Sequence, residues 1–484
     1  MDAKTFLAEL RAALGPTGIL TDAGDIAPAL TDHLNVYSGA ALGVARPATT
    51  AEVQAVVRLC AAHGVAVIPQ GGNTGYCGGA TPPADRPALV LTLARLNRVR
   101  HVDPVGYTLT VDAGVTLAAA GTAAREAQRL FPLSLGSEGT CQIGGNLSTN
   151  AGGTAVLRYG MMRELVLGLE VVLPDGRLLN QLSGLRKDNT GYDVKQWFLG
   201  AEGTLGIITG ACLKLFPQPP AQVTALVGVN RLAEAVQLLG EVRGAFGDAV
   251  TAFEYLPSIA LELLFKNVEQ AKPALDAIHP GQVLVELDAQ LADGALEERF
   301  GEWLMSNPLV REATLAQNGA QRDALWFLRE NVPSGQRLEG ASIKHDVALP
   351  IAHLAQFHAE ASAYLAAQYP DLRLVAYGHV GDGNLHFNLS PAAGPTQFTT
   401  AEERQAFLAT GAARLQSVKE EIRRYVHDVV ARHGGSFSAE HGIGQAKVAE
   451  LERYEDPVAL ELMRGMKAML DPQGIMNPGK VVRG

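Results

Sequence analysis

The spacing of apolar positions near the N-terminus predicts two helices. Residues Met1–Gly15 form a short amphipathic pattern, whose apolar face consists of Phe6, Leu7, Leu10 and Leu14. A second helix is expected to begin after Thr49, because Thr49 and Glu52 have the spacing of a capping box, and to end at Gly64. The chain therefore opens with a helix signal and lacks the basic and then apolar regions of a secretory signal.

Short apolar runs after these helices predict buried strands. The strand candidates are Val65–Ile68, Leu89–Leu93 and Leu109–Val111, and a further helix is expected from Thr116 to about Leu130. Many glycines separate these elements. The alternation of strands and helices indicates an α+β or α/β fold for the first half of the chain.

The pattern changes near residue 216, where the prolines of Phe216–Pro220 interrupt regular structure. We place the first boundary there and expect domains at 1–217 and 218–430 and a C-terminal segment at 431–484. The second domain mixes helices and strands, which suits an antiparallel sheet covered by helices. The main signals are a helix at Leu232–Phe246, strands at Gln282–Leu287 and Leu372–Ala376, and helices at Ala401–His433 and Val448–Met469.

Composition and charge narrow the class of protein. The chain has 484 residues, nearly half of them apolar, which is material for two or three globular domains. The net charge of -10 argues against nucleic-acid binding, and no apolar run is long enough to span a membrane. The four cysteines form no CxxC pair, which favours a reducing compartment. We expect a cytoplasmic protein; peripheral membrane contact and a homodimer stay open.

Three glycine-rich segments carry the first chemical signal: Gln70–Gly79, Gly136–Gly153 and Gly200–Gly210. Glycines mixed with Ser, Thr and Asn let the backbone approach a ligand and turn N–H groups toward phosphate oxygens. A single loop of this kind is usually structural, but three together favour a ligand that contains a pyrophosphate. Neither the Rossmann nor the P-loop motif occurs, so a dinucleotide would be held in another way.

These segments resemble the FAD-binding segments of flavoproteins of the vanillyl-alcohol oxidase type. The resemblance rests on PQGGNTG at 69–75, GTCQIGGN and TNAGG between 139 and 153, GAEGTLG at 200–206, and NPGK at 477–480. Within that superfamily, the chain is most similar to D-2-hydroxyglutarate and D-lactate dehydrogenases. The resemblance implies an α+β fold with a two-part FAD-binding domain of the p-cresol methylhydroxylase type. It also implies a substrate cap built on a helix-covered antiparallel sheet and a C-terminal helical segment that returns to the FAD domain.

The resemblance further implies which residues surround the FAD. They are Gly71, Gly72, Asn73, Thr74, Gly75, Gly139, Gly144, Asn146, Thr149, Gly153, Ile207 and Asn477. Some relatives tether the FAD through a histidine in the first loop. Asn73 stands at that position, so a non-covalent FAD is expected.

A second chemical signal lies between Tyr377 and Asn388. If residues 384–388 form a strand, the alternation of side chains sends the polar residues to one face and the apolar ones to the other. His379 precedes this strand, His386 lies on its polar face, and Glu440 would complete a set of two histidines and a carboxylate. Such ligands suit zinc, and also manganese, cobalt or iron. Each residue alone is more often simply a polar residue with protein partners, but together they resemble the family's metal site.

His441 follows Glu440, and the resemblance makes it the general base. Oxidation of a 2-hydroxy acid removes the hydroxyl proton and a hydride, and a neutral imidazole is suited to accept that proton near neutral pH. The hydride goes to the flavin, and a metal bound to the substrate oxygens would lower the pKa of the hydroxyl. The alternative is a histidine with a packing role only.

Two cations match family positions that hold substrate carboxylates, namely Arg329 and Lys344. Lys344 has a rival interpretation, because the alternate residues of 342–346 would share one solvated face of a strand. Asn388 would add a hydrogen bond to the substrate. Pro333 stands where some hydroxyglutarate-oxidising relatives carry a hydroxyl residue, so the group that holds the far end of the substrate stays open.

The sequence thus predicts an FAD- and metal-dependent dehydrogenase that oxidises a D-2-hydroxy acid to the 2-oxo acid. D-2-Hydroxyglutarate is the first choice, and D-lactate or D-malate the alternative. A metal-dependent hydrolase is a different class, against which the glycine loops argue. A third option is a flavin-binding subunit of a larger complex. The electron acceptor stays open between an electron-transfer flavoprotein, a quinone and a dye.

Overall fold

The computed structural model describes residues 2–289, 291, 294–394 and 398–483, and the chain divides into two compact units. Unit 1 comprises Met1–Gly153, Tyr159–Gln218 and Glu440–Gly484, and unit 2 comprises Thr154–Arg158 and Pro219–Ala439. Each unit contains its own clusters of buried apolar side chains. Each therefore has a core that stabilises it separately.

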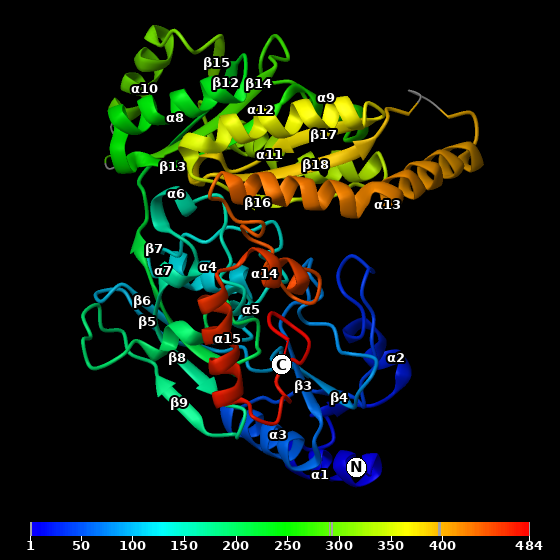
Figure 1. Cartoon of the computed structure of the whole chain (residues 1–484). Coiled ribbons are helices and arrows are strands. Elements are labelled where there is room, and N and C mark those ends of the chain that lie inside the picture. The colour runs from blue at the N-terminus through cyan, green and yellow to red at the C-terminus, as the bar shows by residue number, and fades with distance from the viewer. Residues whose placement is uncertain (1, 290, 292–293, 395–397, 484) are drawn as a thin grey trace. The chain divides into compact units, whose positions relative to one another are not determined.

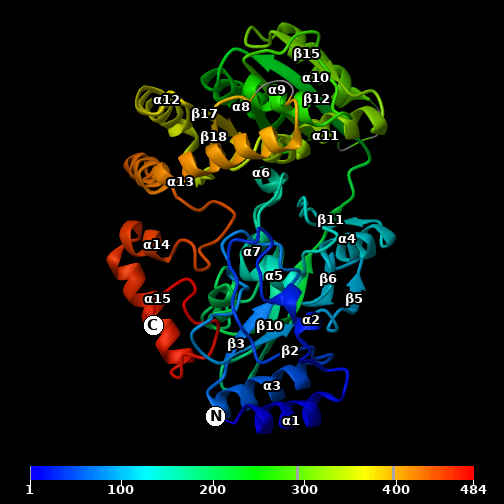
Figure 2. The ribbon, with the colours of Figure 1, turned by 90° about the vertical axis from the view of Figure 1, so that its right-hand side faces the viewer.

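The first part of unit 1 is a four-stranded sheet in the order β1-β2-β4-β3. Strands β2 to β4 are parallel, and β1 pairs antiparallel with β2. Helices α1 and α3 lie side by side in both views (Figures 1 and 2). The bounds are Ile19–Leu20 for β1, Val44–Ala45 for β2, Ala66–Gln70 for β3, Ala88–Thr92 for β4, Ala3–Leu14 for α1, Ala23–Ile26 for α2 and Thr50–His63 for α3.

The predicted start and end of α3 are confirmed. The hydroxyl of Thr49 accepts a hydrogen bond from the backbone N–H of Glu52, and the carboxylate of Glu52 accepts one from the N–H of Ala48. Gly64 ends the helix in the left-handed region, with φ of 66°. A side chain at that position would strain the backbone, so glycine is the residue suited to this end.

The second part of unit 1 is a five-stranded antiparallel sheet in the order β5-β6-β10-β8-β9. The chain returns to unit 1 at its end, where the backbone of Val67 in β3 bonds to Ile475 and Asn477. The C-terminus accordingly lies near β3 in Figure 1. The strands are β5 (Val99–Asp103), β6 (Thr108–Asp112), β8 (Val166–Val172), β9 (Leu178–Gln181) and β10 (Ile207–Lys214).

One predicted helix of unit 1 is shorter than expected. Helix α4 spans Leu117–Glu126 and does not continue to Leu130. Gln128 has a positive φ of 56°, and Arg129–Leu130 form strand β7, which pairs with β11 (Phe216–Pro217). The helix ends because a left-handed residue breaks its hydrogen-bond pattern.

The helix predicted at 448–469 is two helices, α14 (Val448–Tyr454) and α15 (Pro457–Leu470). Proline cannot continue a preceding helix but suits the first position of a new one. The side chain of Asp456 caps α15 by accepting hydrogen bonds from the N–H groups of Val458 and Ala459. These local signals override the continuous apolar periodicity.

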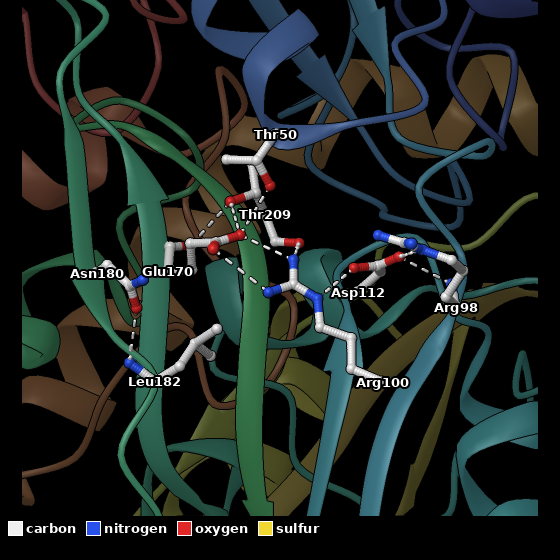
Figure 3. A network of polar contacts seen from close by, with 8 residues as sticks. All are labelled: Thr50, Arg98, Arg100, Asp112, Glu170, Asn180, Leu182 and Thr209. Atoms are coloured by element: carbon white, nitrogen blue, oxygen red, sulfur yellow. Dashed lines mark hydrogen bonds and ion pairs between the residues drawn. The ribbon is translucent and has the colours of Figure 1, made fainter.

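A charged network links the strands of the five-stranded sheet (Figure 3). The guanidinium of Arg100 lies between two carboxylates: Nε donates to Asp112 at 2.5 Å, and Nη2 donates to Glu170 at 2.8 Å. The hydroxyls of Thr50 and Thr209 also donate to Glu170. Burial raises the pKa of Glu170, but the hydrogen bonds from Arg100 and both threonines lower it by more. The two carboxylates are therefore stable in the sheet as long as Arg100 is present.

We predict that Arg100→Ala lowers the free energy of unfolding by about 3 kcal/mol, because it leaves the buried carboxylate of Glu170 without its cation and Asp112 with only the exposed Arg98. The matched control is Arg98→Ala. Arg98 also contacts Asp112, but its side chain is 72% exposed against 23% for Arg100. The control is expected to cost less than about 1 kcal/mol. Urea denaturation of both variants measures this, and equal losses would contradict the role of Arg100.

Unit 2 contains two antiparallel sheets, in the orders β13-β14-β12-β15 and β16-β18-β17. Reciprocal backbone hydrogen bonds between Tyr255 and Gly378 join the two sheets. The strands are β12 (Gln222–Val229), β13 (Val250–Pro257), β14 (Gly281–Asp288), β15 (Glu312–Leu315), β16 (Asp346–Ala348), β17 (Leu372–Tyr377) and β18 (Asn384–Pro391).

Helices cover these sheets, as predicted for the second domain. Helices α12 and α13 run alongside β17 and β18 (Figure 1). Among the described residues, no helix combines the length and apolar character that crossing a membrane requires. The helices are α8 (Leu232–Phe246), α9 (Ser258–Asn267), α10 (Ala295–Ser306), α11 (Gly319–Leu338), α12 (Ile351–Gln368) and α13 (Ala401–Arg432). Short helices span Ile143–Ser148 (α5), Val156–Tyr159 (α6) and Met162–Leu165 (α7).

Candidate active site

A cavity in unit 1 is lined by all three glycine-rich segments and by His441. The loop after β3, the helix α5 and the start of β10 supply its walls. The structure therefore brings together segments that are far apart in the sequence. Of the residues predicted to surround the FAD, the following line the cavity: Gly71, Gly72, Asn73, Thr74, Gly75, Gly144, Asn146, Thr149 and Ile207.

Close approach of neighbouring atoms explains two glycines of this cavity. A Cβ atom on Gly72 would lie 2.1 Å from the carbonyl oxygen of Thr140, and one on Gly144 would lie 2.8 Å from the Cβ of Ala113. The wall also contains the side-chain oxygen of Gln142, which is buried and has no hydrogen-bond partner among the described residues. A bound dinucleotide offers hydrogen-bond donors to such an acceptor, so the cavity fits the FAD that the sequence predicts.

Three residues of the predicted FAD set do not line the cavity. Gly139 is exposed, and Gly153 lies against the backbone of Ser134. The side chain of Asn477 donates hydrogen bonds to the carbonyl oxygens of Gly79, at 2.9 Å, and Glu202, at 2.7 Å. Both of these residues line the cavity. Asn477 thus holds the wall in place, and direct contact of these three residues with a cofactor stays a prediction.

Asn73, which stands where some relatives carry a tethering histidine, adopts a left-handed conformation with φ of 53°. Its amide donates a hydrogen bond of 2.8 Å to the carbonyl oxygen of Thr31. The side chain therefore fixes the shape of the loop, and an amide offers no nucleophile for a covalent link to a flavin.

Glu202 holds the loop that carries His441, a role that the sequence analysis did not predict. The carboxylate of Glu202 accepts hydrogen bonds from the N–H groups of Ile443, at 2.7 Å, and Gly444, at 2.8 Å. Burial raises the pKa of Glu202, and these two bonds partly offset the rise. The imidazole of His441 packs edge-on against the ring of Tyr76, with centroids 4.8 Å apart.

We predict that Gly72→Ala weakens FAD binding, because its Cβ would displace the backbone at Thr140. Overpacking of this kind costs about 1–3 kcal/mol, which corresponds to a roughly tenfold to hundredfold higher dissociation constant. Gly24→Ala serves as control, since a Cβ there meets no atom within 4 Å. Fluorescence titration of the apoprotein with FAD measures both, and unchanged affinity in Gly72→Ala would contradict the assignment of the cavity.

In unit 2, the structure brings together the two histidines predicted as metal ligands. His386 lies on β18, opposite Asp346 of β16 and Tyr377 of β17. His379 follows β17, and its ring centroid is 5.6 Å from that of His386. The carboxylate of Asp346 is 3.9 Å from Nδ1 of His386, so it is a further oxygen donor in the neighbourhood. The predicted alternation is confirmed for Leu385 and Phe387, which are fully buried.

The rival interpretation of Lys344, in which alternate residues of 342–346 share one solvated strand face, does not match the structure. Strand β16 begins only at Asp346, which is buried and accepts a hydrogen bond from the amide of Asn384. Lys344 precedes the strand and is exposed. Desolvation nevertheless lowers the pKa of its ammonium group, and Arg337 lowers it further. Substrate binding by Lys344 stays a prediction.

A buried glutamate links the predicted metal ligand His379 to the predicted substrate cation Arg329. Glu254 lies on β13; its Oε1 is 2.6 Å from Nδ1 of His379, and its Oε2 accepts a hydrogen bond of 2.5 Å from Nε of Arg329. Nη2 of Arg329 lies 3.3 Å from Nε2 of His379. The three side chains form a closed triangle of polar contacts, and no sequence motif pointed to Glu254.

Two carboxyl groups in this cluster have opposite pKa shifts. Burial raises the pKa of Glu254, but His379 and Arg329 outweigh it and lower the pKa to about 2. Burial raises the pKa of Asp382 to about 6, which His379 opposes and Glu254 reinforces. Glu254 is therefore charged near neutral pH, and its charge is matched by the cation beside it.

Asn388, predicted to contact substrate, has protein partners in the structure. Its Nδ2 donates to the side-chain oxygen of Gln336 at 3.0 Å, and its Oδ1 accepts from the backbone N–H of His345. Glu440 directly follows Ala439, at the point where the chain passes from unit 2 to unit 1. Substrate contact for Asn388 and metal ligation by Glu440 stay predictions.

Comparison with known protein families decides the class. The model of an FAD binding domain matches residues 41–181, and the model of the C-terminal domain of FAD linked oxidases matches residues 218–481, more than half of the chain. The chain belongs to the FAD-linked oxidases. This membership confirms the predicted flavin chemistry and makes the protein an oxidoreductase.

Individual proteins extend the likeness over nearly the whole chain. A mitochondrial D-2-hydroxyglutarate dehydrogenase of Bos taurus is 38% identical over 470 residues, which cover 96% of this chain and 81% of that protein. A D-2-hydroxyglutarate dehydrogenase of Xanthomonas citri pv. viticola is 36% identical over 475 residues, covering 98% and 96%. The structure of p-cresol methylhydroxylase with bound substrate covers 99% of this chain and 97% of its own, with a TM-score of 0.76 at 18% identity. The predicted fold class is thereby confirmed.

Proposed function

We propose that this FAD-linked oxidase oxidises a D-2-hydroxy acid, first of all D-2-hydroxyglutarate, to the 2-oxo acid. The observation that carries the proposal is the similarity, over nearly the whole chain, to proteins named D-2-hydroxyglutarate dehydrogenase. The reaction requires a group that accepts the hydroxyl proton and cations that bind carboxylates. The chain offers His441 in the flavin cavity for the first task, and Arg329 and Lys344 for the second.

In the proposed reaction, FAD when bound supplies the acceptor of the hydride. The glycine segments hold it without a covalent link, and a neutral ring nitrogen of His441 accepts the hydroxyl proton. Glu202 binds the backbone two and three residues after His441 and so limits the positions that the imidazole can take. Orientation of this kind places the base at a constant distance from the proton that it removes.

We further propose His379, His386 and Glu440 as ligands of a divalent metal, with zinc as first choice. Two imidazoles and one carboxylate form a donor set that suits zinc, and the two rings lie close together in unit 2. When bound, such an ion supplies a positive charge that lowers the pKa of the substrate hydroxyl. His441 then has a more acidic proton to remove.

The cations of unit 2 favour a dicarboxylate over a monocarboxylate. Arg329 offers a bidentate fork and Lys344 a point charge, which would match the two carboxylates of D-2-hydroxyglutarate or D-malate. D-Lactate carries only one carboxylate and remains the alternative. Asn388 would add a hydrogen bond beside His386, on the same face of β18.

Membership of the FAD-linked oxidases removes the support for a metal-dependent hydrolase. The flavin-binding subunit of a larger complex remains an alternative within the family. For the electrons we propose an electron-transfer flavoprotein or a quinone as acceptor.

We predict the highest kcat/KM with D-2-hydroxyglutarate when it is compared with D-malate and D-lactate. The preference over D-lactate follows because cations would hold both carboxylates of a dicarboxylate, and the preference over D-malate rests on the similarity to proteins named D-2-hydroxyglutarate dehydrogenase. Steady-state assays with an artificial dye as acceptor measure this, and L-2-hydroxyglutarate is the stereochemical control. A higher kcat/KM with D-lactate would overturn the choice of a dicarboxylate but leave the reaction class intact.

We predict that His441→Asn lowers the rate constant of flavin reduction by about 10²–10⁴, because the variant lacks the base. Its FAD content is expected to match that of the wild type. His63→Asn is the control: His63 lies in the same unit, pairs with Glu9 and is not part of the cavity. Anaerobic stopped-flow absorbance measures both, and reduction of His441→Asn at the wild-type rate would contradict the role of His441.

A further inference from the structure

The carboxylate of Glu254 is bound to protein groups at both oxygens. One oxygen faces Nδ1 of His379 at 2.6 Å, and the other accepts the Nε–H of Arg329 at 2.5 Å. The side chain of Glu254 is only 1% exposed, and the side chains of His379 and Arg329 are 9% and 6% exposed. Water therefore has little access to these contacts, and the geometry is set by the protein groups themselves.

The contacts of His379 determine which of its nitrogens carries the proton. A guanidinium can only donate, so the approach of Arg329 to Nε2 at 3.3 Å requires a lone pair on Nε2. A carboxylate can only accept, so the contact between Glu254 and Nδ1 requires a proton on Nδ1. Both contacts thus select the same tautomer. That tautomer leaves Nε2 as the ring nitrogen with a lone pair, which is the form that ligates a metal.

The same carboxylate fixes the orientation of Arg329. Because Nε is bound to Glu254, the plane of the guanidinium cannot rotate freely, and Nη2 lies on the side of His379. If a metal takes the lone pair of Nε2, the contact with Nη2 is lost while the bond from Nε to Glu254 persists. Arg329 then retains its position through Glu254.

Glu286 on the neighbouring strand provides an internal comparison. It also lies buried in the sheet and accepts hydrogen bonds from an arginine of α11, in this case Arg322, and from Trp326. Among the described residues, its carboxylate accepts hydrogen bonds from Gln222, Thr224, Arg322 and Trp326, none of which belongs to the candidate site. Glu286 and Glu254 therefore both link the sheet to α11. Only Glu254 also contacts a histidine, His379.

We propose that Glu254 is a positioning residue for the reaction, which fixes the tautomer of His379 and the orientation of Arg329 through its two carboxylate oxygens. This inference rests on the proposed function, in which His379 is a metal ligand and Arg329 binds a substrate carboxylate. It adds a residue that contacts neither substrate nor flavin in the proposed reaction. Removing its charge is expected to weaken metal binding and substrate binding together.

The experiment compares Glu254→Gln with Glu286→Gln. A glutamine at 254 accepts one hydrogen bond and directs an NH₂ group at the other partner, so His379 must change its tautomer or Arg329 must move. We expect the zinc dissociation constant of the metal-free protein to rise roughly tenfold to hundredfold in Glu254→Gln, as is typical when the partner of a ligating histidine is lost. The KM for D-2-hydroxyglutarate at saturating zinc should rise as well. Glu286→Gln should lower only the melting temperature.

Chelator competition with zinc alone measures the dissociation constants. The His379→Ala variant distinguishes a failure of the positioning role of Glu254 from a failure of the metal site itself. If zinc binding is lost in His379→Ala but is equal in Glu254→Gln and the wild type, the positioning role is wrong and the metal site stands. If His379→Ala binds zinc like the wild type, the metal site itself is wrong, and this inference fails with it. Equal effects of Glu254→Gln and Glu286→Gln on zinc affinity would also overturn the positioning role.

A measurement on the wild type covers the case in which Glu254→Gln does not fold. Histidine ¹⁵N chemical shifts of the metal-free protein report the tautomer of each ring, and the His379→Ala variant identifies the signal of His379. The contacts described above require a proton on Nδ1 and none on Nε2. A His379 with its proton on Nε2 would contradict the inference.

Discussion

A carboxylate inside a sheet is stable only when its charge is matched, since an unpaired buried charge costs several kcal/mol. In unit 2, Glu254 meets this constraint with Arg329 of α11 and His379 of the loop after β17. One buried charge thus ties a strand, a helix and a loop together. The positions of His379, the proposed metal ligand, and Arg329, the proposed substrate cation, are fixed by their contacts with the buried carboxylate of Glu254. Structural stability and the orientation of the site residues have the same cause.

In unit 1 the main constraint is different: neighbouring segments approach one another closely around a cavity. Gly72 and Gly144 occur where a side chain would collide with Thr140 and Ala113. The loop with His441 is attached to this cavity through the carboxylate of Glu202. At these glycines the cavity wall is formed by backbone, which suits a ligand with phosphates, whereas the cluster of unit 2 consists of charged and polar side chains.

Local signals in the sequence predicted much of this arrangement. The glycine segments, the capped helix after Thr49 and the alternation around His386 each depend on neighbouring residues, and the structure has them as expected. The break between α14 and α15 was not predicted, because the apolar periodicity continues through it and the cap at Asp456 with the following proline was given too little weight. Glu254 and Glu202 were missed as anchoring residues for a physical reason: their partners lie 125 and 241 residues away, and pairing at such separations leaves no local pattern.

The most direct test of the proposed function is an anaerobic absorbance titration of the FAD-loaded protein with D-2-hydroxyglutarate. Bleaching of the flavin bands by the D-acid but not by the L-acid, and less bleaching after a chelator has been added, is the predicted result. A flavin spectrum that stays oxidised with D-2-hydroxyglutarate, D-malate and D-lactate, in the presence of added zinc, would contradict the function as a D-2-hydroxy acid dehydrogenase.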